Sequence, residues 1–455
     1  MGRTACLGEG QWTGTMGRAF ARGPRLVPPR GAGVAGRGRL RAAAAGLGRV
    51  GWWLPLHLAL AGAVSVAISG NMQAFAAALT AAPDPPAWRV RAQFLLVNGG
   101  AVLVAAGYPS HRAPVVAAGG AAFLAAMVLL GWSVVAAWRR GLNRRHAWVL
   151  ALYGAAIAAV LTGGTIGSLI GSGAVHDPLT WLALRRAHMT VNVLGWGALT
   201  VAGTAVTLLP TVLRVRMPAW RGPVFGGLLA GGVALLAGGL ATRSNPVAAA
   251  GAVVFEAGAL GVVVFAGRAV RSLPRRRPPV AAGHLVAGIA WLVFGAGYLA
   301  TTLLSGRSFD SFLPQFLVVF ALGFLVQVLL GAWLYLIPMA RLASPSERRL
   351  LLAAADLGGT WRGFAINGGL ALLALRAAGI VPAATGRTGG AIALAGGGRG
   401  PGGHLGIPVH GPDPSRRGSG GSAVRTPAHG LIGPSGPCPP ARGSTHRRRY
   451  GLTGR

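Results

Sequence analysis

Long apolar runs recur along most of this chain, and they restrict its possible folds more than any other feature. Between positions 51 and 380, stretches of about eighteen or more mainly apolar residues alternate with short polar interruptions. Each stretch is long enough to cross about 30 Å of hydrocarbon as a helix. Only 11% of the 455 residues are charged, whereas soluble domains average about 25%. The sequence therefore excludes a soluble single-core enzyme and predicts an all-α, polytopic transmembrane helix bundle.

Three regions of different composition follow one another along the chain. Residues 1–49 are rich in Gly, Arg and Pro and contain no apolar run long enough to span a membrane. Residues 50–382 hold the apolar stretches and are expected to form the bundle. Residues 383–455 are rich in Gly, Pro, Arg and Ser and show no hydrophobic periodicity. Such segments bury too little apolar surface to offset the entropy of ordering, so both ends are predicted to be disordered.

Ten transmembrane helices are predicted in the bundle, because a spanning segment without water must bond its own backbone N–H groups. The expected bounds are 51–75, 92–108, 113–137, 147–171, 187–210, 222–241, 247–267, 280–303, 312–338 and 362–380. Glycines also recur four residues apart, at Gly163, Gly167 and Gly171 and again at Gly227 and Gly231. Small residues at this spacing let helix backbones approach closely, so they predict helix-to-helix packing.

The formal net charge of +35 does not indicate a nucleic-acid-binding protein. All 43 basic side chains are arginine, a bias typical of GC-rich coding sequence, and lysine is absent. The arginines lie in loops and terminal segments, whereas a phosphate-binding surface gathers them on one face of a folded domain. We therefore expect the lipid bilayer of the cell membrane, and no nucleic acid, as the main partner.

The arginines in the short loops predict the orientation of the helices. Eighteen of the twenty-three arginines between the predicted spans follow odd-numbered spans. Because cytoplasmic loops carry the excess of positive charge, the loops after spans one, three, five, seven and nine are expected inside the cell. Residues 1–49, with nine arginines, would then lie outside. This conflict indicates an unnatural start, a missing preceding helix or a miscounted span.

Histidines within the predicted spans are candidates for function, because ionisable groups are expensive inside a membrane. His57 is expected about 9 Å from the outer end of the first span, and His188 near the outer end of the fifth. Imidazole commonly binds copper and haem iron, and two histidines on facing helices can hold a haem axially. Asn192, one helical turn after His188, is expected to orient its ring. The alternative is that each histidine only hydrogen-bonds a neighbouring helix.

Three other ionisable residues are weaker candidates. His176 in a predicted outer loop and His284 at the inner start of the eighth span are possible metal ligands by residue type. Glu256 is the one acidic residue deep in a predicted span. It is expected to be protonated or paired with an arginine, and a proton relay or ion coordination is the alternative. The chain has no HExxH, Walker or CxxC motif, so the sequence assigns no catalytic residue.

Several strings in the predicted spans occur in the same order as in a known family. They are HLALAGA at 57–63, HMTVNVLGWGALT at 188–200, TLLPTVLR at 207–214 and QVLLGAWLYLIP at 327–338, followed by Asn367. Over roughly residues 50–380 the chain resembles the membrane part of actinobacterial copper oxidase-like proteins, which carry multicopper oxidase (cupredoxin-type) domains. Those membrane regions are distantly similar to haem–copper oxidase subunit I. The resemblance implies a redox-associated membrane protein with haem or copper near the outer face, and a cupredoxin or other electron-transfer partner there.

Two features depart from that family. Thr190 stands where the family tends to carry a second histidine, and residues 383–455 contain neither a strand pattern nor a Cys/His/Met ligand set. Copper-oxidase activity, which belongs to the cupredoxin part, is therefore not expected of this chain. One alternative is a transporter or permease-like bundle with a path lined by Glu256 and the polar groups of spans two and nine. Another is a truncated copper oxidase-like remnant without activity of its own.

Overall fold

The structure is a computed structural model that describes residues 51, 53–218, 220–274, 278–341, 344–382, 388, 391 and 392. The described part of the chain forms helices and no β-strand. Nine of its helical segments are long and apolar enough to cross a membrane. The predicted all-α bundle of a multi-pass membrane protein is therefore confirmed. The ends for which disorder was predicted, 1–49 and nearly all of 383–455, lie outside the described residues.

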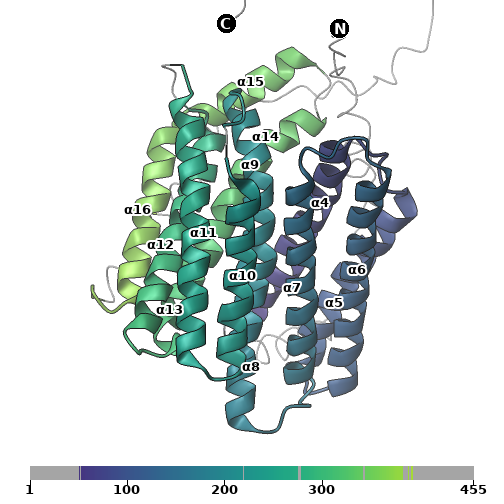
Figure 1. Ribbon diagram of the computed structural model, residues 1–455, viewed down its shortest axis with the longest axis vertical. Coiled ribbons are helices and arrows are strands. Elements are labelled where there is room, and N and C mark those ends of the chain that lie inside the picture. Colours follow the sequence, from purple (N-terminus) through teal and green to yellow (C-terminus); the bar gives the residue numbers. More distant parts are fainter. Residues whose placement is uncertain are drawn as a thin grey trace, which may run out of the picture. The chain divides into compact units, whose positions relative to one another are not determined.

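The membrane-crossing helices stand side by side and are joined by short loops (Figure 1). The single helices are α5 (Ala87–Gly107), α6 (Ala113–Arg140), α7 (Ala147–Gly171), α10 (Gly222–Ala241), α11 (Asn245–Arg271) and α12 (Val280–Leu304). Three spans are composite. The first consists of α3 (Trp53–His57), η1 (Leu58–Val64) and α4 (Ser65–Thr80), and the fifth consists of α8 (Pro178–Thr190), η2 (Val191–Ala198) and α9 (Leu199–Leu213). The ninth consists of η3 (Phe309–Phe312), α13 (Leu313–Phe316), η4 (Leu317–Val326) and α14 (Gln327–Arg341). The observed bounds of α7 and α10 are the same as those predicted for the fourth and sixth spans, 147–171 and 222–241.

In the part of the chain that the structure describes, α14 is followed by α15 (Pro345–Asp356) and α16 (Gly359–Ala377). The tenth predicted span, 362–380, corresponds to α16, which lies beside α12 (Figure 1). It is not among the nine helices that are apolar enough to cross a membrane. The short helix α15 was not predicted, although its start signal is present: Ser344 accepts a hydrogen bond from the Glu347 amide.

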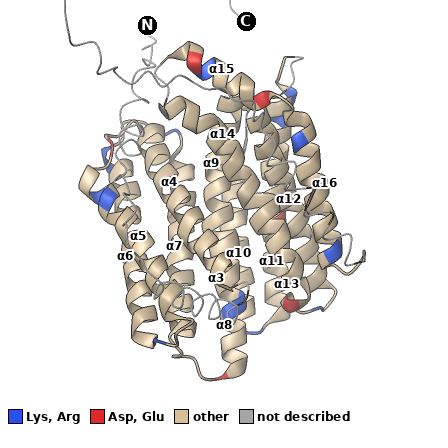
Figure 2. Ribbon diagram, turned by 180° about the vertical axis from the view of Figure 1, so that it is seen from behind, with Lys and Arg blue, Asp and Glu red and all other residues tan. Residues whose placement is uncertain are grey.

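Charged residues gather near the two ends of the bundle and are scarce between them (Figure 2). Large apolar side chains such as Phe94, Val102 and Val253 are exposed on the outer faces of the helices, as contact with lipid requires. The composite span from α8 to α9 is the most enclosed, because 89% of its apolar stretch is buried, against 22% for α5. His188 therefore belongs to the central helix of the bundle.

Three spans change from α-helix to π-helix within the membrane, at η1, η2 and η4. The sequence analysis predicted regular helices and did not foresee these segments. π-Helical turns are rare, and they occur often at functional sites. The segment η1 begins at the residue after His57, and η2 begins three residues after His188. The two spans that carry His57 and His188 thus change from α-helix to π-helix within three residues of the histidine.

One packing prediction is wrong for the described chain. Gly227 and Gly231 of α10 are exposed, and a Cβ on either would meet no described atom within 4 Å. No described helix packs against the face of α10 that carries these two glycines. Their spacing of four residues therefore does not mark a helix-to-helix contact in the described chain. Gly163 and Gly167 of α7, in contrast, are closely packed.

Candidate functional site

The imidazole rings of His57 and His188 lie together. Their centres are 6.3 Å apart, and their planes differ by 14°. His57 is the last residue of α3, whereas His188 lies near the end of α8. Both helices are found at the same end of the bundle (Figure 2), the end that the arginine distribution predicts to face outward. The fold therefore brings the two strongest metal-ligand candidates into one place.

In both imidazole rings, Nδ1 is the nitrogen that forms a hydrogen bond. Nδ1 of His57 donates to the carbonyl oxygen of Trp53 (2.7 Å), and Nδ1 of His188 donates to the carbonyl oxygen of Gly163 (2.8 Å). Because a carbonyl can only accept, Nδ1 carries the proton in both neutral rings and Nε2 keeps its lone pair. Neither Nε2 hydrogen-bonds within the described chain. Metal-ligating histidines usually have this arrangement.

Helix α7 supports His188 through two glycines. A Cβ on Gly167 would lie 2.6 Å from Cε1 of His188, and a Cβ on Gly163 would lie 2.3 Å from Nδ2 of Asn192. Both distances are shorter than real Cβ contacts, so a side chain at either position would displace its neighbour. These two glycines provide the space that the ring of His188 and the amide of Asn192 occupy.

Asn192 contacts His188 as the sequence analysis expected, but its main hydrogen bond goes elsewhere. Its Nδ2 donates to the carbonyl oxygen of His188 (2.7 Å) and lies 3.2 Å from Nδ1. Since the proton on Nδ1 points to the carbonyl oxygen of Gly163, Nδ2 could donate to that nitrogen only in the other tautomer. The hydrogen bond that orients the ring is thus the one that Nδ1 donates to the carbonyl oxygen of Gly163, which the sequence analysis missed.

Two further aromatic rings extend the site beyond His57. Trp53 stacks on His57 with ring centres 4.2 Å apart, and Tyr108 stacks on Trp53 at the same distance. Trp53 precedes His57 by one helical turn, so its proximity could have been read from the sequence. Tyr108 follows the end of α5, and only the fold places it here. Together these rings cover one side of His57.

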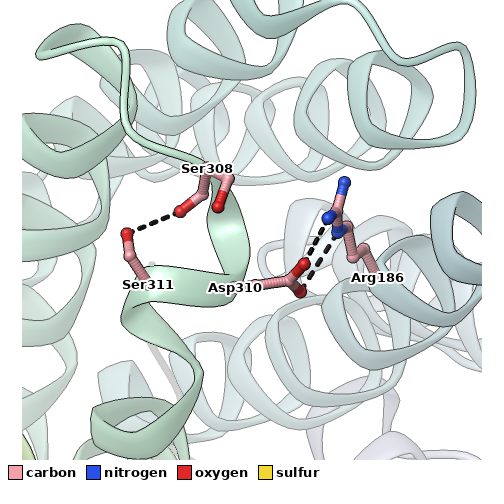
Figure 3. Close-up of polar contacts among 4 residues, drawn as sticks. All are labelled: Arg186, Ser308, Asp310 and Ser311. Atoms are coloured by element: carbon pink, nitrogen blue, oxygen red, sulfur yellow. Dashed lines mark hydrogen bonds and ion pairs between the residues drawn. The ribbon is translucent and has the colours of Figure 1, made fainter.

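An ion pair lies close to His188 in the chain and connects α8 with the segment before α13 (Figure 3). Arg186 donates from Nε to Oδ1 of Asp310 (3.1 Å) and from Nη2 to Oδ2. Two parallel hydrogen bonds of this kind fix both distance and orientation. Ser311 donates to the carbonyl oxygen of Ser308 (2.7 Å) and thereby holds the short turn that carries Asp310. The sequence analysis did not identify this pair.

The start of α8 corrects the predicted depth of His188. The helix begins at Pro178 rather than at 187, because Asp177 caps it by accepting hydrogen bonds from the amide (2.8 Å) and the hydroxyl (2.6 Å) of Thr180. These hydrogen bonds also lower the pKa of the Asp177 carboxyl. Aspartate followed by proline is a recognised helix start, so the signal was present in the sequence. His188 therefore lies about 15 Å along its helix instead of at the edge.

The weaker metal-ligand candidates lie away from the paired histidines. His284 is buried in α12, where its Nδ1 is 3.3 Å from Oε1 of Gln327. Gln327 in turn donates to Asn367 of α16 (2.8 Å). His176 is exposed in the loop before α8. Within the described residues, no group of three or more His, Cys, Asp or Glu side chains could hold a metal ion.

Glu256 lies on α11 against α12. A Cβ on Gly297 would be 3.5 Å from its Oε1, and its buried Oε2 has no hydrogen-bond partner among the described residues. Glu256 forms no ion pair in this part of the chain. The arginine partner that the sequence analysis allowed for Glu256 is therefore not found among the described residues.

Comparisons with protein-family models, curated proteins and solved structures return no match.

Proposed function

We propose that this multi-pass membrane protein binds one metal ion between His57 and His188, at the predicted outer end of the bundle. The distance of 6.3 Å between the two ring centres supports the proposal best. A ligating nitrogen lies about 2 Å from its metal and about 1 Å from its own ring centre. Two imidazoles that hold one ion in line therefore have centres about 6 Å apart.

The chemistry of the donor set favours copper over haem iron. Two neutral imidazoles are sufficient for copper(I), which accepts two nitrogen ligands in line and is bound well by imidazole. A haem would need a slot extending past both rings on several sides. The stacked Trp53 covers one side of His57, and the α7 backbone at Gly163 and Gly167 closes against His188 and Asn192. This packing supports a bare metal ion more than a porphyrin.

Two imidazoles in line would hold copper(I), whereas copper(II) prefers four ligands in a tetragonal arrangement, so electron transfer at this site would need further ligands from a partner. The position of the site at the predicted outer end would allow exchange with a cupredoxin or another redox partner there. The π-helical turns directly after His57 and near His188 also support a functional role, since such turns concentrate at functional sites.

The rival proposal of a transporter has weaker support. Gln93 of the second span hydrogen-bonds Gln73, whereas Gln327 of the ninth span belongs to the cluster with His284 and Asn367. Glu256 lies against Gly297 and forms a hydrogen bond with neither glutamine. The polar groups expected to line one path thus belong to separate clusters.

Copper and haem content of the full chain, purified in detergent, tests the proposal. The wild type is expected to bind about one copper ion per chain when supplied as copper(I). His57→Ala and His188→Ala should each weaken binding by more than about 100-fold, because each removes a direct ligand. His176→Ala, an exposed histidine outside the pair, is the matched control and should bind like the wild type.

Two outcomes would count against the copper site. A wild type that binds neither copper nor haem, or variants that bind copper as tightly as the wild type, would overturn the proposal. A Soret band that both histidine substitutions abolish would retain the paired ligands but change the metal to haem iron.

A further inference from the structure

Buried polar side chains gather between α4, α5 and α6, toward the end of the first span that is opposite to His57. Gln73 of α4 donates to Oε1 of Gln93 of α5, and both side chains are at most 5% exposed. Arg89, one turn before Gln93, is 6% exposed. Oε1 of Gln73, Nε2 of Gln93 and Nε of Arg89 have no hydrogen-bond partner in the described chain. Buried polar atoms without partners are uncommon, so this cluster requires an explanation.

A small cavity lies beside Gln73 and Arg89. Its volume is about 20 Å³, more than the roughly 10–15 Å³ that a single water molecule needs. Arg89, Arg140 and Gln73 line it, together with the proline-rich turn that precedes α5. Asp84 of that turn also contributes to the lining. Two guanidinium groups and one carboxylate leave the cavity with a net positive charge.

Two tryptophans beside Arg89 indicate that it lies near the boundary between hydrocarbon and lipid headgroups. Its Cζ is 4.3 Å from the ring centre of Trp132 and 5.5 Å from that of Trp88. Both indole rings are more than half exposed on the outside of their helices. Tryptophans in such positions concentrate at the boundary between hydrocarbon and headgroups. Arg89 forms no ion pair with a described residue.

We propose that Arg89 and Arg140 bind a phosphate group at this cavity, with one phosphate oxygen in the space of about one water molecule that the cavity offers. The planar guanidinium of Arg89 offers parallel donors that match phosphate oxygens, and Arg140 adds a second positive charge. The first turn of α5 also begins at this cavity, and the positive end of a helix attracts anions. The phosphate belongs either to an anionic phospholipid or to free inorganic phosphate, and the chemistry is the same for both.

Thermal unfolding of the full chain in detergent tests the site, with phosphatidylglycerol, phosphatidylcholine or inorganic phosphate as the probe. Phosphatidylglycerol is expected to raise the unfolding temperature of the wild type by several degrees, because a ligand that binds only the folded state stabilises it. Arg89→Gln and Arg140→Gln should lose most of this increase. Arg139→Gln is the matched control, since Arg139 is the exposed neighbour of Arg140 and does not line the cavity.

The probes distinguish the two sources. An increase with phosphatidylglycerol that millimolar phosphate neither reproduces nor competes away assigns the site to a lipid, whereas an equal effect of phosphate alone assigns it to the free anion. If Arg89→Gln does not accumulate, Arg140→Gln alone decides. No stabilisation of the wild type by any probe, or equal stabilisation of all variants, would overturn the proposal.

Discussion

The backbone of α7 at Gly167 contacts the imidazole ring of His188: a Cβ on Gly167 would lie 2.6 Å from Cε1 and 3.0 Å from Nδ1. The carbonyl oxygen of Gly163, one turn earlier, accepts the hydrogen bond from the same ring. Glycine is thus required at 167 for a specific reason, the position of a histidine on the neighbouring helix. The exposed Gly227 of α10 has the same sequence spacing and no such contact.

Gly167→Ala should therefore affect the candidate metal site. The added methyl group forces the ring of His188 to move, and we expect a loss of about 1–3 kcal/mol in the free energy of unfolding. Copper binding should weaken by about 10-fold or more, because Gly167 is one of the contacts that hold the ring of His188 in place, and the loss of such supporting contacts weakens metal binding by this amount. Gly227→Ala, which meets open space, is the control and should keep or raise stability, because alanine favours a helix over glycine by up to about 1 kcal/mol. Equal behaviour of the two variants would contradict the role of Gly167.

The ion pair between Arg186 and Asp310 should contribute little to stability despite its bidentate geometry. Its side chains are 22% and 35% exposed, and partly exposed pairs are typically worth about 0.2–1 kcal/mol. A double-mutant cycle with Arg186→Gln and Asp310→Asn measures this coupling free energy directly. Arg185→Gln, at the neighbouring position, serves as the control and should show no coupling to Asp310→Asn. A coupling well above that range would indicate that the pair is more enclosed than its exposure suggests.

The loop after α6 should face the cytoplasm. Leu142 in that loop is 89% exposed, so a cysteine there is accessible to a thiol reagent. With Cys6 and Cys438 replaced, Leu142→Cys should react only after the membrane is permeabilised, as the arginine distribution predicts. Ala174→Cys, exposed in the loop between α7 and α8, should react with an impermeant reagent in intact cells. The reverse pattern would place His57 and His188 on the inner side.

The cap of α8 should make its first turn sensitive to acid. The hydroxyl and amide of Thr180 lower the pKa of Asp177 in the folded protein, so the charged carboxylate stabilises this turn. That contribution is complete above the ordinary pKa of 3.8 and is lost as the pH falls through the lower folded-state pKa. The protection of the Thr180 and Trp181 amides from hydrogen exchange, relative to their intrinsic exchange rate at each pH, should therefore fall in acid in the wild type. Asp177→Asn keeps a capping oxygen without the charge, and its exchange should lack this pH dependence over the same interval.

Helix bounds could be predicted wherever apolar length alone decides them. The segments 147–171 and 222–241 are correct to the residue, because each is a continuous apolar stretch between polar loops. The start of α8 was misplaced because Arg185 and Arg186 were read as a loop, although the Asp177 cap was visible in the sequence. The π-helical turns could not be foreseen, since their apolar composition is that of an ordinary membrane helix.

A bundle of membrane-crossing helices follows from the amino-acid sequence alone, because without water each segment must satisfy its own backbone hydrogen bonds locally. The sequence also identifies His57 and His188 as ionisable groups in apolar surroundings. That their rings meet, with the carbonyl of Gly163 beside one and the stacked Trp53 beside the other, depends on the packing of the helices. The rotation and depth of each helix depend on how its side chains pack against several others at once. Contacts between distant segments are set by that packing, which no local pattern in the sequence specifies.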